Sequence, residues 1–105
     1  LDCGTYVNSD SCIAQMEGAV AFGLSLARTD GITMKDGSVD QSNFHDYRVM
    51  RMNESPAISV ELIASSAAPA GVGEPGVPPV APALSNAIFN ATGQRLRKLP
   101  LTLSS

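Results

Sequence analysis

The segment from Ala67 to Pro82 restricts the possible folds of this chain more than any other. It contains five prolines and three glycines in sixteen residues. Proline lacks a backbone N–H and fixes φ, so this density excludes a central strand, and it excludes a helix until the prolines fall within a first turn. We therefore predict a shaped loop here, followed by a helix over about 79–92. Gly93 stands where a left-handed residue would end that helix.

A second helix is predicted over about 9–28. Asn8, Ser9 and Asp10 offer the side-chain oxygens that accept backbone N–H groups where a helix begins. Apolar residues follow at steps of three and four, namely Ile13, Met16, Val20, Leu24 and Ala27. Further apolar residues cover much of the remaining circumference, which is typical of a helix buried on all sides. Gly18 and Gly23 weaken this helix by roughly 1 kcal/mol each, and such glycines often mark the close approach of a backbone or a ligand.

Short strands complete the predicted fold. Residues 1–7 are compatible with a strand, and residues 57–63 alternate in polarity as a strand would. Between them, Ile32–Lys35 and Ser38–Gln41 are predicted to form a hairpin with Asp36–Gly37 at its turn. The predicted fold class is α+β, with the two helices packed on a small mixed or antiparallel sheet. Because 105 residues cannot surround a helix that is apolar on all sides, we expect residues 1–105 to be a fragment of a larger domain.

Charge and hydropathy exclude two classes of function. The formal net charge of −3 argues against nucleic-acid binding, which needs clustered Lys and Arg, and the basic residues from Arg95 to Lys98 are predicted to lie in a solvated tail. No membrane span is predicted, because Gln15 and Glu17 interrupt the longest apolar stretch. No signal segment opens the chain, which leaves the compartment open between the bacterial cytoplasm and the periplasm.

The two cysteines do not predict a metal site. Cys3 and Cys12 lack the paired Cys/His spacing of zinc or iron–sulfur sites, so no metal ligands are predicted within the chain. They can form one disulfide. Buried free thiols are the favoured interpretation, because Cys12 falls on an apolar helical stretch where a small hydrophobic residue is wanted.

Glu74 is the carboxylate with the most unusual surroundings. Gly71, Gly73 and Gly76 permit a backbone to approach a ligand closely, and Pro75 stiffens the turn. The structural interpretation is an exposed turn acid near a helix N-terminus, where negative charge is mildly favoured. Short glycine motifs recur by chance, so this segment alone favours that interpretation. It is not a dinucleotide-binding motif, because that motif follows a strand directly and opens a helix.

The glycine- and proline-rich turn around Glu74 is one of four sequence motifs that occur in a fixed order along the chain. Residues 2–8 contain Asp-Cys-Gly and Val-Asn, residues 15–24 contain Gln-Met-Glu-Gly and Phe-Gly-Leu, residues 43–47 contain Asn-Phe and Tyr, and residues 71–79 contain the glycine- and proline-rich turn. Together they resemble the C-terminal part of the large, molybdopterin-binding subunit of the xanthine dehydrogenase and aldehyde oxidase family. The ending, residues 91–101, is similar to that of the isoquinoline 1-oxidoreductase beta-subunit branch.

The resemblance implies a molybdenum hydroxylase, an oxidoreductase that hydroxylates an N-heteroaromatic or aldehyde substrate with water-derived oxygen. It implies a molybdenum–molybdopterin cofactor that is shared with chain upstream of Leu1. Glu74 matches the active-site glutamate of the family and would act as general base, taking a proton as the oxygen nucleophile forms. Gln15 matches a glutamine that lies against the cofactor, where an amide can donate and accept hydrogen bonds. From the residues alone, Gln15 would instead satisfy a backbone group.

The implied partners are the remainder of the large subunit, a small [2Fe-2S] subunit, a cytochrome c acceptor and a small-molecule substrate. A function of another class is also open, namely a non-catalytic structural or interaction fragment with no cofactor of its own, docking through an exposed apolar helix. The short length favours this alternative for the isolated chain, which we expect to be inactive. His45 and Tyr47 are predicted to be exposed or packed rather than catalytic.

Overall fold

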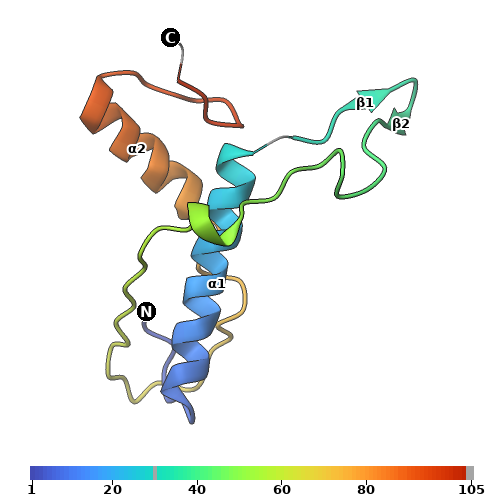
Figure 1. Cartoon of the computed structure of the whole chain (residues 1–105). Coiled ribbons are helices and arrows are strands. Elements are labelled where there is room, and N and C mark those ends of the chain that lie inside the picture. Colours follow the sequence, from blue (N-terminus) through green and yellow to red (C-terminus); the bar gives the residue numbers. More distant parts are fainter. Residues whose placement is uncertain (30, 104–105) are drawn as a thin grey trace.

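The computed structural model describes residues 1–29 and 31–103; Asp30, Ser104 and Ser105 of the predicted domain lie outside the described residues. In chain order the elements are helix α1 (Ser9–Arg28), strands β1 (Met34–Lys35) and β2 (Ser38–Val39), a short 3-10 helix η1 (Met52–Glu54) and helix α2 (Val80–Thr92). Figure 1 shows α1 as the central element, with α2 leaving its upper half at an angle. Two helices and a small antiparallel sheet confirm the predicted α+β class.

Helix α1 begins and ends close to the predicted positions. The Asn8 side chain accepts a hydrogen bond from the Ser11 N–H at 2.9 Å, which satisfies one of the free donors of the first turn. Asp10 lies in the first turn and Arg28 in the last, where each charge complements the helix dipole. The cap and the charges therefore explain the helix bounds locally.

The burial of α1 differs from the prediction. Its buried residues are Cys12, Met16, Ala19, Gly23 and Ala27, whereas the prediction was a helix buried on all sides, with Val20 and Leu24 in its main apolar stripe. The face is rotated toward small residues because α2 and the loop before it pack directly on Ala19 and Gly23. Phe22 and Leu26 remain 59% and 44% exposed, so only one face of α1 is buried by the described residues.

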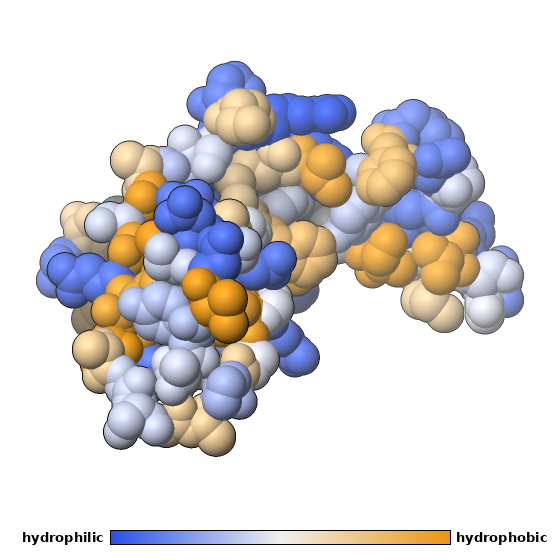
Figure 2. Space-filling model, turned by 90° about the horizontal axis from the view of Figure 1, so that it is seen from below, coloured by the Kyte–Doolittle hydropathy of each residue, from blue (hydrophilic) through white to orange (hydrophobic). Residues whose placement is uncertain are grey.

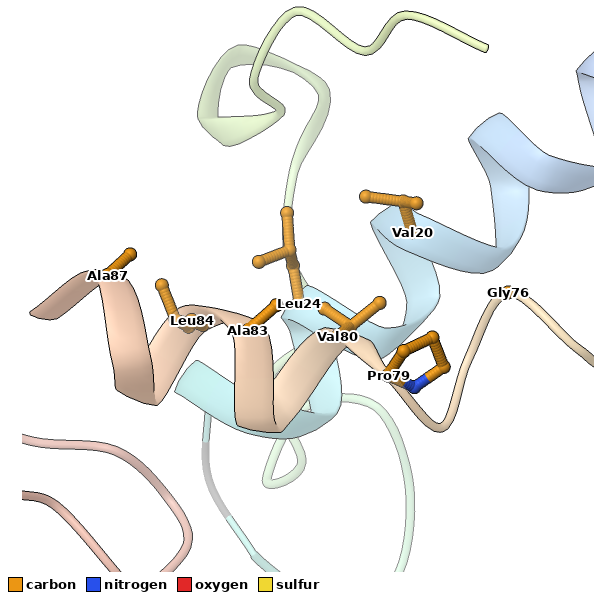
Figure 3. A pocket seen from close by; sticks show the side chains of 8 residues that line it. All are labelled: Val20, Leu24, Gly76, Pro79, Val80, Ala83, Leu84 and Ala87. Carbon is orange, nitrogen blue, oxygen red and sulfur yellow. The ribbon is translucent and has the colours of Figure 1, made fainter. Parts of the chain in front are cut away.

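Helix α2 contacts α1 at its own first turn. A Cβ placed on Gly23 would lie 2.8 Å from the Val80 Cβ, so the two backbones approach as closely as a glycine allows. Val80 is the buried residue of α2. The helix ends as predicted at Gly93, which has φ 74° and donates its N–H to the Phe89 carbonyl at 2.8 Å. Beyond this contact, an apolar groove of about 430 Å³ separates the helices, and its walls include Leu24 and Leu84 (Figure 3).

The hairpin stands apart from the helices. Met34 pairs with Val39 and Lys35 with Ser38, and Asp36 and Gly37 form the turn with φ of 50° and 81°. Two successive residues at positive φ are typical of the tight hairpin turn that Asp-Gly favours. The described strands are exposed and contact neither helix, so the helices pack on each other rather than on the sheet (Figure 1).

The strands predicted over 1–7 and 57–63 do not form. Residue Leu1 does donate its N-terminal amine to the Glu61 carbonyl at 2.7 Å and accept from the Ile63 N–H at 2.8 Å, in the manner of parallel strands. A strand needs a longer run of such pairs, and the described neighbours supply only this bridge. Further on, the Thr5 N–H binds the Ala67 carbonyl at 3.0 Å, so the two segments stay together without a ladder.

The core is small and apolar surface remains uncovered. Its buried residues are Cys3, Cys12, Met16, Ala19, Ala27 and Val80. Figure 2 shows apolar side chains at the surface among polar ones. Both cysteines are buried free thiols, as favoured from the sequence. Burial raises the pKa of the Cys12 thiol, and the neighbouring Cys3 raises it further. No described helix combines the length and the apolar character that crossing a membrane requires.

Candidate active site

The loop over residues 71–79 crosses the buried face of α1, and one glycine makes the crossing possible. A Cβ on Gly76 would lie 2.7 Å from the Ala19 Cβ and 3.3 Å from the Met16 sulfur. The loop then turns twice, with the Val77 N–H bound to the Glu74 carbonyl at 3.0 Å and the Val80 N–H bound to the Val77 carbonyl at 3.2 Å. Glu74 begins the first of these turns and precedes, by two residues, the glycine that contacts α1.

The structure brings together the two residues predicted for the site. Gln15 on α1 and Glu74 on the loop line one hollow of about 410 Å³. The Gln15 Oε1 atom lies 3.9 Å from the position that a Cβ on Gly73 would occupy. The rest of the lining is small or apolar: Ala14, Gly18, Ala19, Phe22, Gly73 and Val77. An amide and a carboxylate therefore share a hollow whose other walls offer few polar side chains.

Both polar side chains of this hollow are free to meet a ligand. Gln15 and Glu74 are exposed. No hydrogen bond or ion pair joins either side chain to another group among the described residues, so the backbone-satisfying role considered for Gln15 is not seen there. The Glu74 carboxylate also does not cap α2, whose N-cap residue is Pro79 with no side-chain cap bond.

Glu74 also borders a second hollow. This hollow has a volume of about 560 Å³, and its lining consists of Gly71, Gly73, Glu74, Pro75 and Pro78. A Cβ on Gly71 would meet no atom within 4 Å. Gly71 and Gly73 thus leave the backbone before Glu74 open to approach, whereas Gly76 after it is taken up by the contact with α1.

Phe22 is a neighbour of this site that was not singled out as a site residue from the sequence, whereas Gly18 was noted there as a point of close approach. The two residues lie on α1 seven and three residues after Gln15, which is the spacing of one helix face. That spacing was the available signal. His45 is exposed and lies 3.6 Å from the Asp46 carboxylate, away from the lining of either hollow.

Metal ligands are not gathered in the described part of the chain. Residues 1–29 and 31–103 contain no group of three or more His, Cys, Asp or Glu side chains that could hold a metal ion. The hollow at Gln15 and Glu74 has neither Cys nor His in its lining. Its donor set therefore suits an organic molecule with a hydrogen-bonding edge.

Known proteins place this fold in a family. The model of the molybdopterin cofactor-binding domain family matches residues 1–56, so it includes Gln15 and stops before Glu74. The chain therefore belongs to the molybdopterin cofactor-binding domain family, which confirms the resemblance and the cofactor class predicted from the sequence. Isoquinoline 1-oxidoreductase subunit beta from Brevundimonas diminuta is 42% identical over 101 residues, which are 96% of this chain and 13% of that protein.

The chain is also similar to a second relative and to a solved structure. The membrane-bound aldehyde dehydrogenase [pyrroloquinoline-quinone] of Gluconacetobacter polyoxogenes is 40% identical over 96% of this chain and 13% of its own length. The reconstituted CO dehydrogenase from Oligotropha carboxidovorans superposes on 88% of this chain and 12% of its own with a TM-score of 0.73 at 24% identity, which supports the fold. The chain thus spans about an eighth of the length of the relatives that it matches, and their names are those of oxidoreductases.

Proposed function

We propose that this chain forms one side of the active site of a molybdenum hydroxylase, which adds water-derived oxygen to a carbon of an N-heteroaromatic or aldehyde substrate. The observation that carries the proposal is the shared hollow of the Gln15 amide and the Glu74 carboxylate, both without a partner among the described residues. The relatives named for isoquinoline and aldehyde oxidation support the two substrate classes.

The residues of the hollow fit one edge of a molybdopterin cofactor. The Gln15 amide can donate and accept hydrogen bonds at once, as the polar edge of a pterin requires. Gly73 lies beside it and has no side chain that would separate the amide from the cofactor. With neither Cys nor His present, this lining would hold the cofactor by hydrogen bonds and not through the metal. When bound, the cofactor accepts the electron pair that leaves the substrate carbon, while water supplies the oxygen.

Glu74 is proposed as the general base. A proton must leave the water-derived oxygen as that oxygen bonds to carbon, and an ionised carboxylate within reach can take it. The Glu74 carboxylate has no competing partner among the described residues and faces a hollow with apolar walls. The contact of Gly76 with α1 positions the loop backbone that carries Glu74. The proposed base is therefore positioned by the backbone and not by a hydrogen bond to its side chain.

The remaining parts of the enzyme are proposed to come from other polypeptide. The rest of the large subunit would supply most cofactor contacts, because the chain spans 13% of its relatives. A [2Fe-2S] subunit and a cytochrome c acceptor would carry the electrons away. These partners complete the redox cycle, which needs an exit for two electrons per substrate.

Replacing Glu74 by Gln in the assembled enzyme tests the proposed base. The amide keeps the size of the side chain and removes its capacity to take a proton, so we expect kcat to fall about a hundredfold or more with the molybdenum content unchanged. Glu17→Gln is the matched control, because Glu17 is an exposed carboxylate of α1 outside both hollows. Turnover within a few fold of the original enzyme would contradict the assignment of Glu74.

Cofactor analysis separates this proposal from a purely structural role. We expect molybdenum and pterin near one per chain in the assembled enzyme. Persistent absence of both would support the alternative of a non-catalytic interaction segment. Because one relative carries pyrroloquinoline-quinone in its name, the same sample should be assayed for that quinone, and its presence in place of molybdenum would contradict the proposed cofactor.

A further inference from the structure

Cys3 and Cys12 are two thiols that the proposed chemistry does not use. Both are buried, with 4% and 8% of their surface exposed, and both are free. Their side chains share a hydrogen bond with each other. A thiol is only a weak donor and acceptor, and aliphatic side chains would fill the same space. Packing alone therefore does not require sulfur at both positions.

The backbone on each side of this contact is held in place. The Cys3 carbonyl accepts the Ala70 N–H at 2.9 Å. A Cβ on Gly4 would lie 2.2 Å from the Ala68 carbonyl oxygen, so the N-terminal segment rests directly on the backbone before the loop of the candidate site. Cys12 belongs to the buried face of α1. The two thiols thus meet where the N-terminal segment and α1 pack together.

Disulfide closure is the reaction that is open to two thiols in contact. A thiolate of the pair attacks an external disulfide and forms a mixed disulfide with it, and the second cysteine then displaces the remaining external thiol. The pair loses two electrons and two protons, and the external disulfide is reduced to two thiols. Burial raises the pKa of the Cys12 thiol, so its thiolate is scarce at neutral pH. The closure is therefore slow, whereas its equilibrium depends on the reduction potential of the pair.

We propose that Cys3 and Cys12 form a redox pair, which closes to an intramolecular disulfide when an external thiol–disulfide couple is oxidising. The bond ties the N-terminal segment, which holds Ala70, to the helix that carries Gln15 three residues after Cys12. Glu74 follows Ala70 by four residues. The closed form thus joins the two carriers of the candidate site through a covalent bond. This inference does not depend on the proposed function, because it concerns the thiols alone.

Alkylation mapping of the assembled enzyme tests the pair. The enzyme is equilibrated for hours with glutathione, from the fully reduced to the fully oxidised form, at neutral and at mildly alkaline pH, so that slow closure can finish. Free thiols are then alkylated in denaturant and the protein is digested. No Lys or Arg precedes Arg28 in this sequence, so trypsin leaves both cysteines on one peptide, and a protease that cuts before Asp10 separates them. Cys3→Ala and Cys12→Ala are the matched variants.

We expect the tryptic peptide from oxidised enzyme to be lighter by two hydrogens and to take no alkyl group, and to take two alkyl groups after reduction. Cleavage before Asp10 should leave the two pieces joined in the oxidised sample. The Thr5 and Ala70 amides join the N-terminal segment to residues 67–70. Their hydrogen exchange should slow about tenfold on oxidation, because the cross-link restrains local opening. Cys12→Ala should show no such dependence on glutathione.

Three results would overturn the redox pair or its structural effect. Two alkyl groups on the peptide throughout the series, at both pH values, would show that the thiols are packing residues only. Glutathione on one cysteine, with the other left free, would show that the two are not each other's partner. A disulfide that leaves exchange at Thr5 and Ala70 unchanged would exclude the proposed tie between the segments. None of these measurements uses turnover, so failure of the proposed function would be a separate result.

Discussion

Gly76 lies against Ala19 so closely that a Cβ on Gly76 would stand 2.7 Å from the Ala19 side chain. Through this contact the loop that carries Glu74 rests on the buried face of α1. The same Cβ would stand 3.3 Å from the Met16 sulfur. The position of the proposed base thus depends on the absence of one methyl group two residues away from it.

Gly76→Ala should detach this loop from α1. The added methyl group meets the Cβ of Ala19, which cannot rotate away, so we expect the free energy of unfolding to fall by about 1–3 kcal/mol. Chemical unfolding of the protein measures the change. Gly71→Ala is the control, because a Cβ there meets no atom within 4 Å, and equal effects of the two substitutions would contradict the close contact.

Gly23 and Gly18 should respond to alanine in opposite directions although they share one helix. Both substitutions gain up to about 1 kcal/mol of helix propensity. At Gly23 the new methyl group lies 2.8 Å from the Val80 Cβ and 3.2 Å from the Val77 carbonyl oxygen, both fixed to backbone. We therefore expect a net loss of stability for Gly23→Ala and a gain for Gly18→Ala in urea unfolding. Stabilisation by both would show that α2 does not rest on Gly23.

Gln15→Ala should weaken cofactor retention. One hydrogen bond to a ligand contributes on the order of 1 kcal/mol, so we expect the apparent affinity for the pterin cofactor to fall severalfold, up to about tenfold. Pterin and molybdenum per chain after extended dialysis of the assembled enzyme are the measurements. Glu17→Ala, two residues along α1 and outside the hollow, is the control. Full retention in Gln15→Ala would remove Gln15 from the proposed site.

Glu54 should make the stability of η1 and its surroundings depend on acid pH. The Arg51 N–H donates to its carboxylate at 2.8 Å, and this bond, followed by the nearby Arg48 guanidinium, holds the Glu54 pKa below its usual value. A lowered pKa in the folded state means that the stabilisation is fully present above the unfolded pKa. It is lost as pH falls through the folded pKa.

The pair Glu54→Gln and Arg48→Gln checks this dependence. Urea unfolding at neutral pH should show a larger loss for Glu54→Gln, because the backbone bond is the larger cause of the pKa shift and Arg48→Gln leaves it in place. The difference between the original protein and Glu54→Gln should shrink as the pH is lowered through the acid range. A difference that is constant with pH would contradict the linkage.

Locally determined features were predictable from the sequence. The Asn8 cap, the prolines before Val80 and the positive φ of Gly93 set the helix bounds through neighbouring residues, so reading those residues was enough. The Asp36–Gly37 turn was equally local. Glu74 and Gln15 were assigned from the family resemblance, and no local signal placed them in one hollow.

Contacts between distant segments were not predictable in the same way. Helix α1 was predicted to be buried on all sides, with Val20 and Leu24 in its main apolar stripe, because large apolar side chains mark burial in a hydropathy pattern. The structure instead uses Ala19 and Gly23, since close backbone approach requires small residues. The strand predicted over 57–63 failed for a related reason, because an alternating pattern does not reveal whether a neighbouring strand is present.

Helix α1 is the common attachment point of segments from all along the chain. The Ser25 hydroxyl accepts from the Met50 N–H at 3.0 Å, and the Ala27 carbonyl accepts from the Leu101 N–H at 2.7 Å. The N-terminus is tied to Glu61, 60 residues away. An isolated helix forms in roughly 1 μs, whereas contacts of such separation must first offset the entropy of closing long loops. Folding should therefore proceed outward from a preformed α1, and the loop that carries Glu74 takes its place only after the chain between them has been closed.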